Sequence, residues 1–159
     1  MNKKDILEYL NKLNICYELF EHKRVYNMEE VKEINLPYPE LDAKNLFIRD
    51  DKRQNYYLVS IIGSKRLDLK ELRKKENLRP LTFASSEELE LMLKLEPGSV
   101  TPFGLLNTSY NVIFYIDEDF LNKKIGIHPN SNDATVFLNT SDLIDIIKLN
   151  GNTVKTIKL

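Results

Sequence analysis

The chain has 159 residues, of which 42% are apolar and 30% are charged, and its formal net charge is −1. This length predicts a single domain, residues 1–159, with a substantial buried core, and it excludes a second ordinary domain. A nearly neutral protein is not a general binder of polyanions, so a contact with nucleic acid would need a local patch of positive charge.

The pattern of polar and apolar residues divides the chain into helices and strands with no internal repeat. Helices are predicted where Leu and Ile recur at spacings of three and four, often behind a capping residue such as Asn2 or Ser85. Strands are predicted where β-branched and aromatic residues gather. In chain order, the predicted elements are a helix over 3–14, a strand over 16–21, a helix over 27–34, strands over 44–50 and 55–62, a helix over 68–77, a strand over 81–84, a helix over 85–94, strands over 111–117, 124–128 and 134–139, a helix over 142–149 and a strand over 153–158.

The order of these elements predicts the fold class. They do not alternate strictly between strand and helix, as those of a parallel α/β fold do. We therefore expect an α+β fold in which a mixed or antiparallel sheet is curled and helices pack around it. The strand over 55–62 is apolar on both faces, which predicts burial on both sides.

The one cysteine, Cys16, has no partner for an internal disulfide, which suits a reducing compartment such as the cytoplasm. Its apolar and aromatic neighbours predict that it is buried. No secretory signal is visible at the N-terminus, and no apolar segment approaches the roughly 18 residues that a membrane span needs. We expect a cytoplasmic protein that does not act at a membrane.

Several classes of enzyme lack their sequence signatures here. There is no glycine-rich phosphate loop, no pair of cysteines for zinc and no Gly-x-Ser-x-Gly nucleophile motif. The two histidines, His22 and His128, lie far apart in the chain and form no metal-binding helix motif. We expect neither a metal nor a cofactor.

Three short segments carry residues suited to chemistry. The first is Lys44-Asn45 at the start of an apolar strand, the second is the loop from Gly98 to Gly104, and the third is His128-Pro129-Asn130. The loop could point backbone N–H groups at an oxyanion or a ribose. Taken singly, each has an ordinary structural interpretation, as a solvated lysine, a plain loop and a surface or core histidine.

Together, these segments resemble a known family. Lys-Asn-Leu-Phe-x-Arg-Asp over 44–50, Gly-Ser-Val-Thr-Pro-Phe-Gly over 98–104 and His-Pro-Asn over 128–130 occur in the order typical of the YbaK/ProX aminoacyl-tRNA editing family. The chain looks most like the branch of free-standing Ala-tRNA(Pro) deacylases. The resemblance covers about residues 3–158. One departure lies over 36–43, where the family usually has small or polar residues, often with Gly, and this affects the expected shape of the pocket.

The resemblance implies a six- or seven-stranded mixed, barrel-like sheet with flanking helices. It implies catalytic positions at Lys44, Asn45 and His128. It also implies a substrate-binding set made up of Gly98, Ser99, Val100, Thr101, Pro102, Phe103, Gly104 and Asn130. The implied reaction is hydrolysis of the ester between an amino acid and the terminal adenosine of a mischarged tRNA.

The residue types at these positions fit that reaction. Lys44 is a compact charge able to polarise or position the ester or a nearby phosphate. Asn45 can donate to the carbonyl or order a water molecule, and His128 can orient groups or relay a proton. The substrate's own 2′-hydroxyl is a further candidate to assist. Selectivity would be steric, with a cavity sized for alanine excluding proline. The sequence assigns no general base.

Residues 65–79 form the most basic stretch of the chain. They contain seven Lys and Arg against three Asp and Glu, an excess of four positive charges. A solvated helix face is one interpretation, and docking of the tRNA acceptor stem is the functional one. The residues predicted to contact tRNA are Lys65, Arg66, Lys70, Arg73, Lys74 and Lys75.

Two alternatives stay open at the level of the sequence. One is an enzyme with a different substrate, such as Cys-tRNA(Pro) or another small mischarged pair. The other is a binding or regulatory module of the same fold without turnover. For partners we expect mischarged tRNA(Pro) and a transient contact with prolyl-tRNA synthetase, and we expect the protein to be a monomer.

Overall fold

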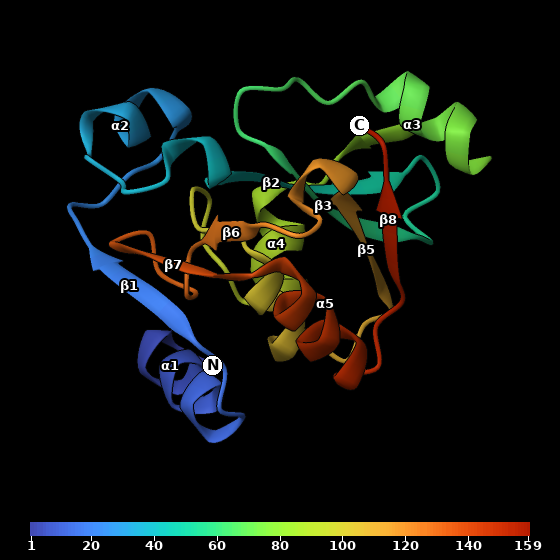
Figure 1. Cartoon of the computed structure of the whole chain (residues 1–159). Coiled ribbons are helices and arrows are strands. Elements are labelled where there is room, and N and C mark those ends of the chain that lie inside the picture. Colours follow the sequence, from blue (N-terminus) through green and yellow to red (C-terminus); the bar gives the residue numbers. More distant parts are fainter.

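The computed structural model describes all residues, 1–159, and Figure 1 shows how the elements are arranged. The α-helices are α1 (Lys3–Lys12), α2 (Met28–Glu33), α3 (Leu69–Glu76), α4 (Ser86–Leu93) and α5 (Thr140–Leu149). The strands are β1 (Tyr17–Glu21), β2 (Ala43–Asp50), β3 (Tyr56–Ile62), β4 (Leu81–Phe83), β5 (Val112–Asp117), β6 (Lys124–Ile127), β7 (Ala134–Asn139) and β8 (Val154–Ile157). Three 3-10 helices are η1 (Pro39–Leu41), η2 (Pro102–Asn107) and η3 (Glu118–Phe120).

Each helix and strand predicted from the sequence is present, because the local signals are strong. The Asn2 side chain accepts the Asp5 N–H at 2.9 Å while the Asp5 carboxylate accepts the Asn2 N–H at 2.9 Å, so both ends of the capping box at α1 form. Ser85 and Glu88 cap α4 in the same reciprocal way. The predicted burial of β3 on both faces is also confirmed.

The strands form two sheets. The larger has the order β4-β2-β3-β5-β8, in which β2 runs antiparallel to both neighbours while β3, β5 and β8 are parallel. The smaller is antiparallel, with the order β1-β7-β6. A single bridge between Asp42 and Gly126 joins them. The predicted mixed α+β fold is therefore present, with eight strands in two sheets that meet at one seam.

Apolar residues cover both faces of the larger sheet. One face packs with α1, α4, α5 and the smaller sheet in the main core, which includes Phe47, Leu58 and Phe114. The other face carries a smaller cluster in which Leu72 of α3 packs against Val59. Figure 1 shows this division, with α3 on one side of the sheet and α4 and α5 on the other. Both faces of the larger sheet are thus covered by packed apolar side chains.

Two details differ from the sequence predictions. Cys16 is exposed, not buried, because it lies in the turn after α1 and β1 begins pairing with β7 only at Tyr17. The end of the loop over 98–104 is helical, since Pro102 opens η2. No helix of the structure is both long enough and apolar enough to cross a bilayer.

Candidate active site

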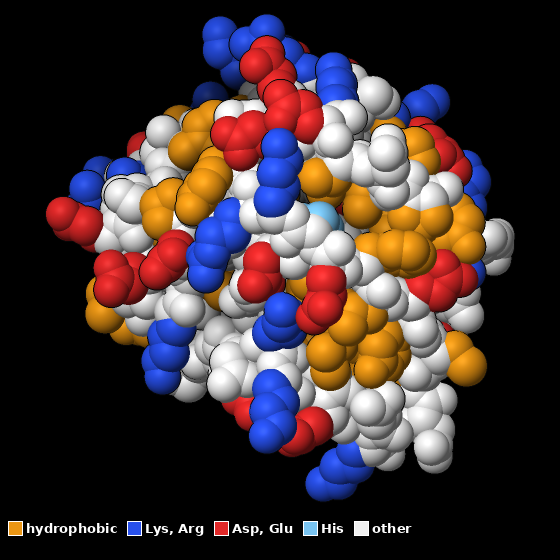
Figure 2. Space-filling model, turned by 90° about the vertical axis from the view of Figure 1, so that its left-hand side faces the viewer, with side chains coloured by type: hydrophobic (Ala, Val, Ile, Leu, Met, Phe, Trp, Pro, Cys, Tyr) orange, Lys and Arg blue, Asp and Glu red, His pale blue; other side chains and the backbone are white.

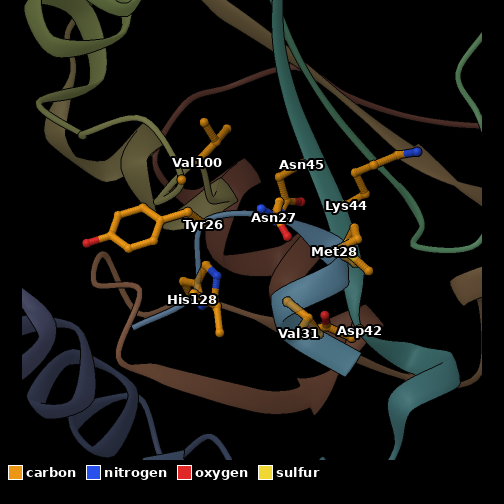
Figure 3. Close-up of a pocket in the computed structure, with 12 residues that line it drawn as sticks. Tyr26, Asn27, Met28, Val31, Asp42, Lys44, Asn45, Val100 and His128 are labelled. Carbon is orange, nitrogen blue, oxygen red and sulfur yellow. The ribbon is translucent and has the colours of Figure 1, made fainter. Parts of the chain in front are cut away.

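A cavity of about 340 Å³ opens beside the seam between the sheets. Four segments that are distant in sequence supply its walls, as Figure 3 shows: the start of α2 with the residues before it, the start of β2, the loop after α4 and the end of β6. The lining residues are Val25, Tyr26, Asn27, Met28, Val31, Asp42, Ala43, Lys44, Asn45, Gly98, Val100 and His128. The three segments singled out from the sequence therefore meet at one place.

Asn45 offers a free amide to the cavity. The Ser60 hydroxyl, buried on the adjacent strand β3, donates to Asn45 Oδ1 at 2.5 Å. This contact fixes the orientation of the amide, and no protein acceptor takes the Nδ2 hydrogens. Asn45 is thus positioned to donate to a carbonyl oxygen or a water molecule in the cavity.

His128 is held in one tautomer. Its Nδ1 lies 2.8 Å from the Ala134 carbonyl oxygen, so Nδ1 carries the hydrogen and donates it. Burial lowers the pKa of His128; the hydrogen bond to Ala134 opposes this shift and the nearby His22 adds to it. The ring is therefore neutral at pH 7, and its Nε2 keeps a lone pair able to accept a hydrogen bond or a proton.

Lys44 lies at the rim of the cavity. Its ammonium donates to the Lys65 carbonyl, and Figure 3 shows the side chain extending away from His128. Burial lowers the pKa of Lys44, and the charge of Arg66 lowers it further. The structure therefore brings the Lys44 backbone into the site and leaves its charge outside the space between Asn45 and His128.

The loop after α4 contributes less of the cavity than its motif implies. Only Gly98 and Val100 line the wall. Gly98 has a φ of +87°, and a Cβ at this position would lie 3.2 Å from the Tyr26 ring, so both its conformation and its contact favour glycine. Thr101 is buried and donates from its hydroxyl to the His128 carbonyl at 2.6 Å, which ties the loop to β6.

The remaining predicted substrate-binding residues lie away from the cavity. Phe103 is fully buried in the main core, and Pro102 and Gly104 are buried beside it in η2. Ser99 and Asn130 line a separate depression, where Asn130 Nδ2 donates to the Met1 carbonyl at 2.9 Å. These residues shape the loop and the turn that carry the site.

The basic stretch over 65–79 is only partly free. Lys65 pairs with Asp117 at 2.9 Å and with Asp119 at 2.6 Å. Lys75 and Arg73 donate to the carbonyls of Lys158 and Leu78. The exposed side chains with no hydrogen bond or ion pair are those of Arg66, Lys70 and Lys74.

Sequence reasoning missed several lining residues. Met28, Val31 and Tyr26 come from a short helix and the turn before it, which carry no motif. Asp42 was also missed, although it is only 6% exposed and lies two residues before Lys44. Burial raises the pKa of Asp42 to about 7. Its only signal in the sequence is its place in the unusual stretch over 36–43, since the burial of Asp42 is visible only in the structure.

Figure 2 shows the face that carries α2, β1 and β7. Part of a histidine side chain is visible between apolar side chains, and positive and negative groups are mixed over this face with no large patch of one sign. No three His, Cys, Asp or Glu side chains come together as a metal-binding cluster.

Comparison with known proteins gives the family of the chain. Residues 22–146 match the aminoacyl-tRNA editing domain. The chain is 40% identical over 161 residues to the prolyl-tRNA editing protein ProX of Acetoanaerobium sticklandii, covering 99% of this chain and 97% of that protein. The chain belongs to the aminoacyl-tRNA editing domain family.

Other relatives extend this family assignment. The prolyl-tRNA synthetase associated domain-containing protein 1 of Mus musculus is 30% identical over 155 residues, covering 94% of this chain and 92% of that protein. A solved structure of a protein proposed to be a trans-editing enzyme for prolyl tRNA synthetase superposes with a TM-score of 0.70 at 20% identity, covering 98% of this chain and 94% of that one. At 20% identity, the similarity to this solved structure supports the fold alone.

Proposed function

We propose that this protein is a trans-editing deacylase that hydrolyses the aminoacyl ester of mischarged tRNA(Pro), with Ala-tRNA(Pro) as its substrate. One observation carries the proposal: an editing-family chain places Lys44, Asn45, Gly98 and His128 around a single small cavity. The identity with the ProX protein over nearly the whole chain supports the choice of tRNA(Pro).

The cavity supplies the groups that ester hydrolysis needs. The Asn45 amide is fixed by Ser60 and can donate to the ester carbonyl, whose oxygen gains negative charge in the transition state. His128 Nε2 can accept a hydrogen bond from the attacking water or from the 2′-hydroxyl of the terminal ribose. The ester is already activated, so positioning and two hydrogen bonds suffice for useful acceleration.

Lys44 serves the nucleic-acid side of the substrate in this arrangement. Its ammonium lies at the rim, on the Lys65 carbonyl, and not between Asn45 and His128. A lysine is a point charge suited to phosphate, so we place it against the phosphate or ribose of the terminal nucleotide. This position also brings the cavity close to the basic stretch, since Lys65 opens the loop that leads to α3.

Selection of the amino acid would follow from the apolar wall. Val25, Met28, Val31 and Val100 bound the space beside the polar groups. A wall of this kind rejects a larger side chain such as that of proline by steric clash, whereas it distinguishes a missing methylene by only about 1–3 kcal/mol. Alanine is therefore accepted and the cognate amino acid is excluded.

The partners follow from the same proposal. The protein binds the acceptor end of tRNA(Pro) through Arg66, Lys70 and Lys74, contacts prolyl-tRNA synthetase transiently and acts as a monomer in the cytoplasm. The free cations of α3 support the first of these statements, because phosphate contacts need exposed side chains that are not already neutralised.

The test is direct. The purified protein is incubated with tRNA(Pro) charged with Ala, Cys or Pro, and loss of the ester is followed against time. We expect rapid loss of the alanyl ester, with the prolyl ester remaining at its uncatalysed rate. Rapid loss of the cysteinyl ester alone would reassign the substrate, and no accelerated loss of any ester would support a binding module without turnover.

A further inference from the structure

Asp42 is fixed directly at the wall of the cavity. Its backbone N–H donates to the carbonyl of Pro39, the first residue of η1, and its backbone forms the bridge to Gly126 that joins the two sheets. Its carbonyl also lies so close to Gly63 that a Cβ there would approach to 2.9 Å. The side chain therefore has a rigid base and faces the cavity together with Met28 and Val31, as Figure 3 shows.

The carboxylate of Asp42 has no partner within the protein. No cation lies within ion-pair distance and no N–H or O–H group donates to it, although the residue is only 6% exposed. The other buried acids differ: Asp50 accepts hydrogen bonds from Lys52, Gln54 and Asn55, and Asp117 is paired with Lys65. An ion buried without a partner is costly, so such a group is expected to find one.

The charged and titratable neighbours do not supply that partner. The Lys44 ammonium is directed at the Lys65 carbonyl, and His128 is neutral with its one N–H already donated to Ala134. The rest of the wall near Asp42 is apolar, with Val25, Met28, Val31 and Ala43. Any cation that pairs with Asp42 would therefore come from a ligand in the cavity.

An aminoacyl ester presents one cation, the α-ammonium group on the carbon beside the reacting carbonyl. We propose that Asp42 binds the α-ammonium of the aminoacyl group and so orients the ester between Asn45 and His128. This inference rests on the proposed function, and it makes Asp42 a substrate-binding residue. Because burial raises the pKa of Asp42 to about 7, a bound cation would restore the charged form that the empty cavity disfavours.

The test compares two esters on two proteins. The substrates are alanyl-tRNA(Pro) and lactyl-tRNA(Pro), in which a hydroxyl replaces the ammonium, and each rate is divided by its uncatalysed rate in the same buffer. The proteins are the wild type and Asp42→Asn, which keeps the shape and removes the charge. Asp145→Asn, an exposed acid of α5 that has no partner, is the matched control.

We expect the wild type to favour the alanyl ester over the lactyl ester by about 10- to 100-fold in kcat/KM, the range of a charge-assisted hydrogen bond. Asp42→Asn should lose this factor on the alanyl ester and leave the lactyl ester within about 2-fold, so that the preference disappears. Asp145→Asn should keep it. Asp42→Ala tests the same expectation a second time, because it removes the carboxylate without introducing an amide.

Each other outcome is informative. Equal losses on both esters would assign Asp42 to proton transfer or to structure and overturn the inference. A wild type that hydrolyses both esters equally well would overturn it too, while leaving the deacylase function intact. If the wild type accelerates loss of neither ester, it is the proposed function that fails, and the inference fails with it.

Discussion

Two carboxylates of this molecule differ in how deeply they are buried and in the partners that surround them. Glu88 of α4 is paired with Arg49 at 3.0 Å, accepts a hydrogen bond from the Tyr56 hydroxyl and closes the capping box of its own helix. Asp42 has no partner at all. The first lies between α4 and the larger sheet, and the second lines the cavity.

Their pKa values show the consequence. Burial acts to raise the pKa of Glu88, but the donated hydrogen bonds from Tyr56, the Ser85 backbone and Arg49 outweigh it and lower the pKa to about 2. Burial acts unopposed on Asp42 and raises its pKa to about 7. An acid with a complete set of donors belongs to the scaffold, whereas a buried acid without donors points to the place where a ligand arrives.

The largest effect we expect is on activity, from a substitution at the cavity. Lys44→Ala should lower kcat/KM for Ala-tRNA(Pro) by about 10- to 100-fold, the range for loss of a charge-assisted contact to the terminal nucleotide. The melting temperature should change little, because the ammonium makes one hydrogen bond at the rim. Lys44→Met keeps the aliphatic stem and should lose as much activity. Normal turnover in either folded variant would remove Lys44 from the mechanism.

Substitution of Glu88, in the scaffold, should change stability and leave activity unchanged. Glu88→Ala leaves Arg49 without its partner and should lower the free energy of unfolding by about 3 kcal/mol, with activity per folded molecule unchanged. Because the pKa of Glu88 is lower in the folded state, its contribution is complete above pH 4.5 and is lost as the pH falls toward 2. Denaturant unfolding at several pH values measures both effects. A loss of activity without a loss of stability would show that Glu88 acts in the reaction and not in the scaffold.

Asp42→Asn should raise stability, which is unusual for a substitution at a buried site. The folded-state pKa of Asp42 is raised, so stability is highest at low pH and falls as the pH rises from about 4 toward 7. The variant should lack this fall and exceed the wild type by about 1–2 kcal/mol above pH 7, since an unpaired buried charge is removed. The difference between the two unfolding curves against pH is the measurement. A variant less stable than the wild type at pH 8 would reveal a partner that the carboxylate needs.

The smallest expected effect concerns α3. Replacing both Lys70 and Lys74 by Ala should raise KM for charged tRNA by about 3- to 10-fold and flatten its dependence on salt, because two phosphate contacts are lost. The rate at saturating tRNA should stay the same. Lys12→Ala with Lys148→Ala, on α1 and α5, is the matched control for net charge. An equal change in the control pair would reduce α3 to a solvated helix face.

The sequence predicts the fold well because its signals are local. Capping boxes at Asn2 and Ser85, and the apolar run of β3, depend on neighbours within a few residues. The prediction for Cys16 was wrong. Its apolar and aromatic neighbours suggest burial, but its exposure depends on where β1 begins to pair with β7.

The site is predictable only in part, for the same reason. Motifs that resemble the editing family identify Lys44, Asn45 and His128 and place them together. No local pattern shows that the Lys44 ammonium reaches the Lys65 carbonyl or that Lys65 is neutralised by Asp117, which is distant in sequence. Asp42 becomes conspicuous only when the donors around it can be counted in three dimensions.

The position of α2 at the cavity has a consequence for how such an enzyme changes over evolutionary time. The cavity wall formed by Met28 and Val31 belongs to α2, a helix that buries none of its residues in either core cluster. Substitutions on such a helix usually cost little stability. New amino-acid preferences can therefore arise by exchanging side chains of α2 while Asn45 and His128 stay on a scaffold that does not need to be rebuilt.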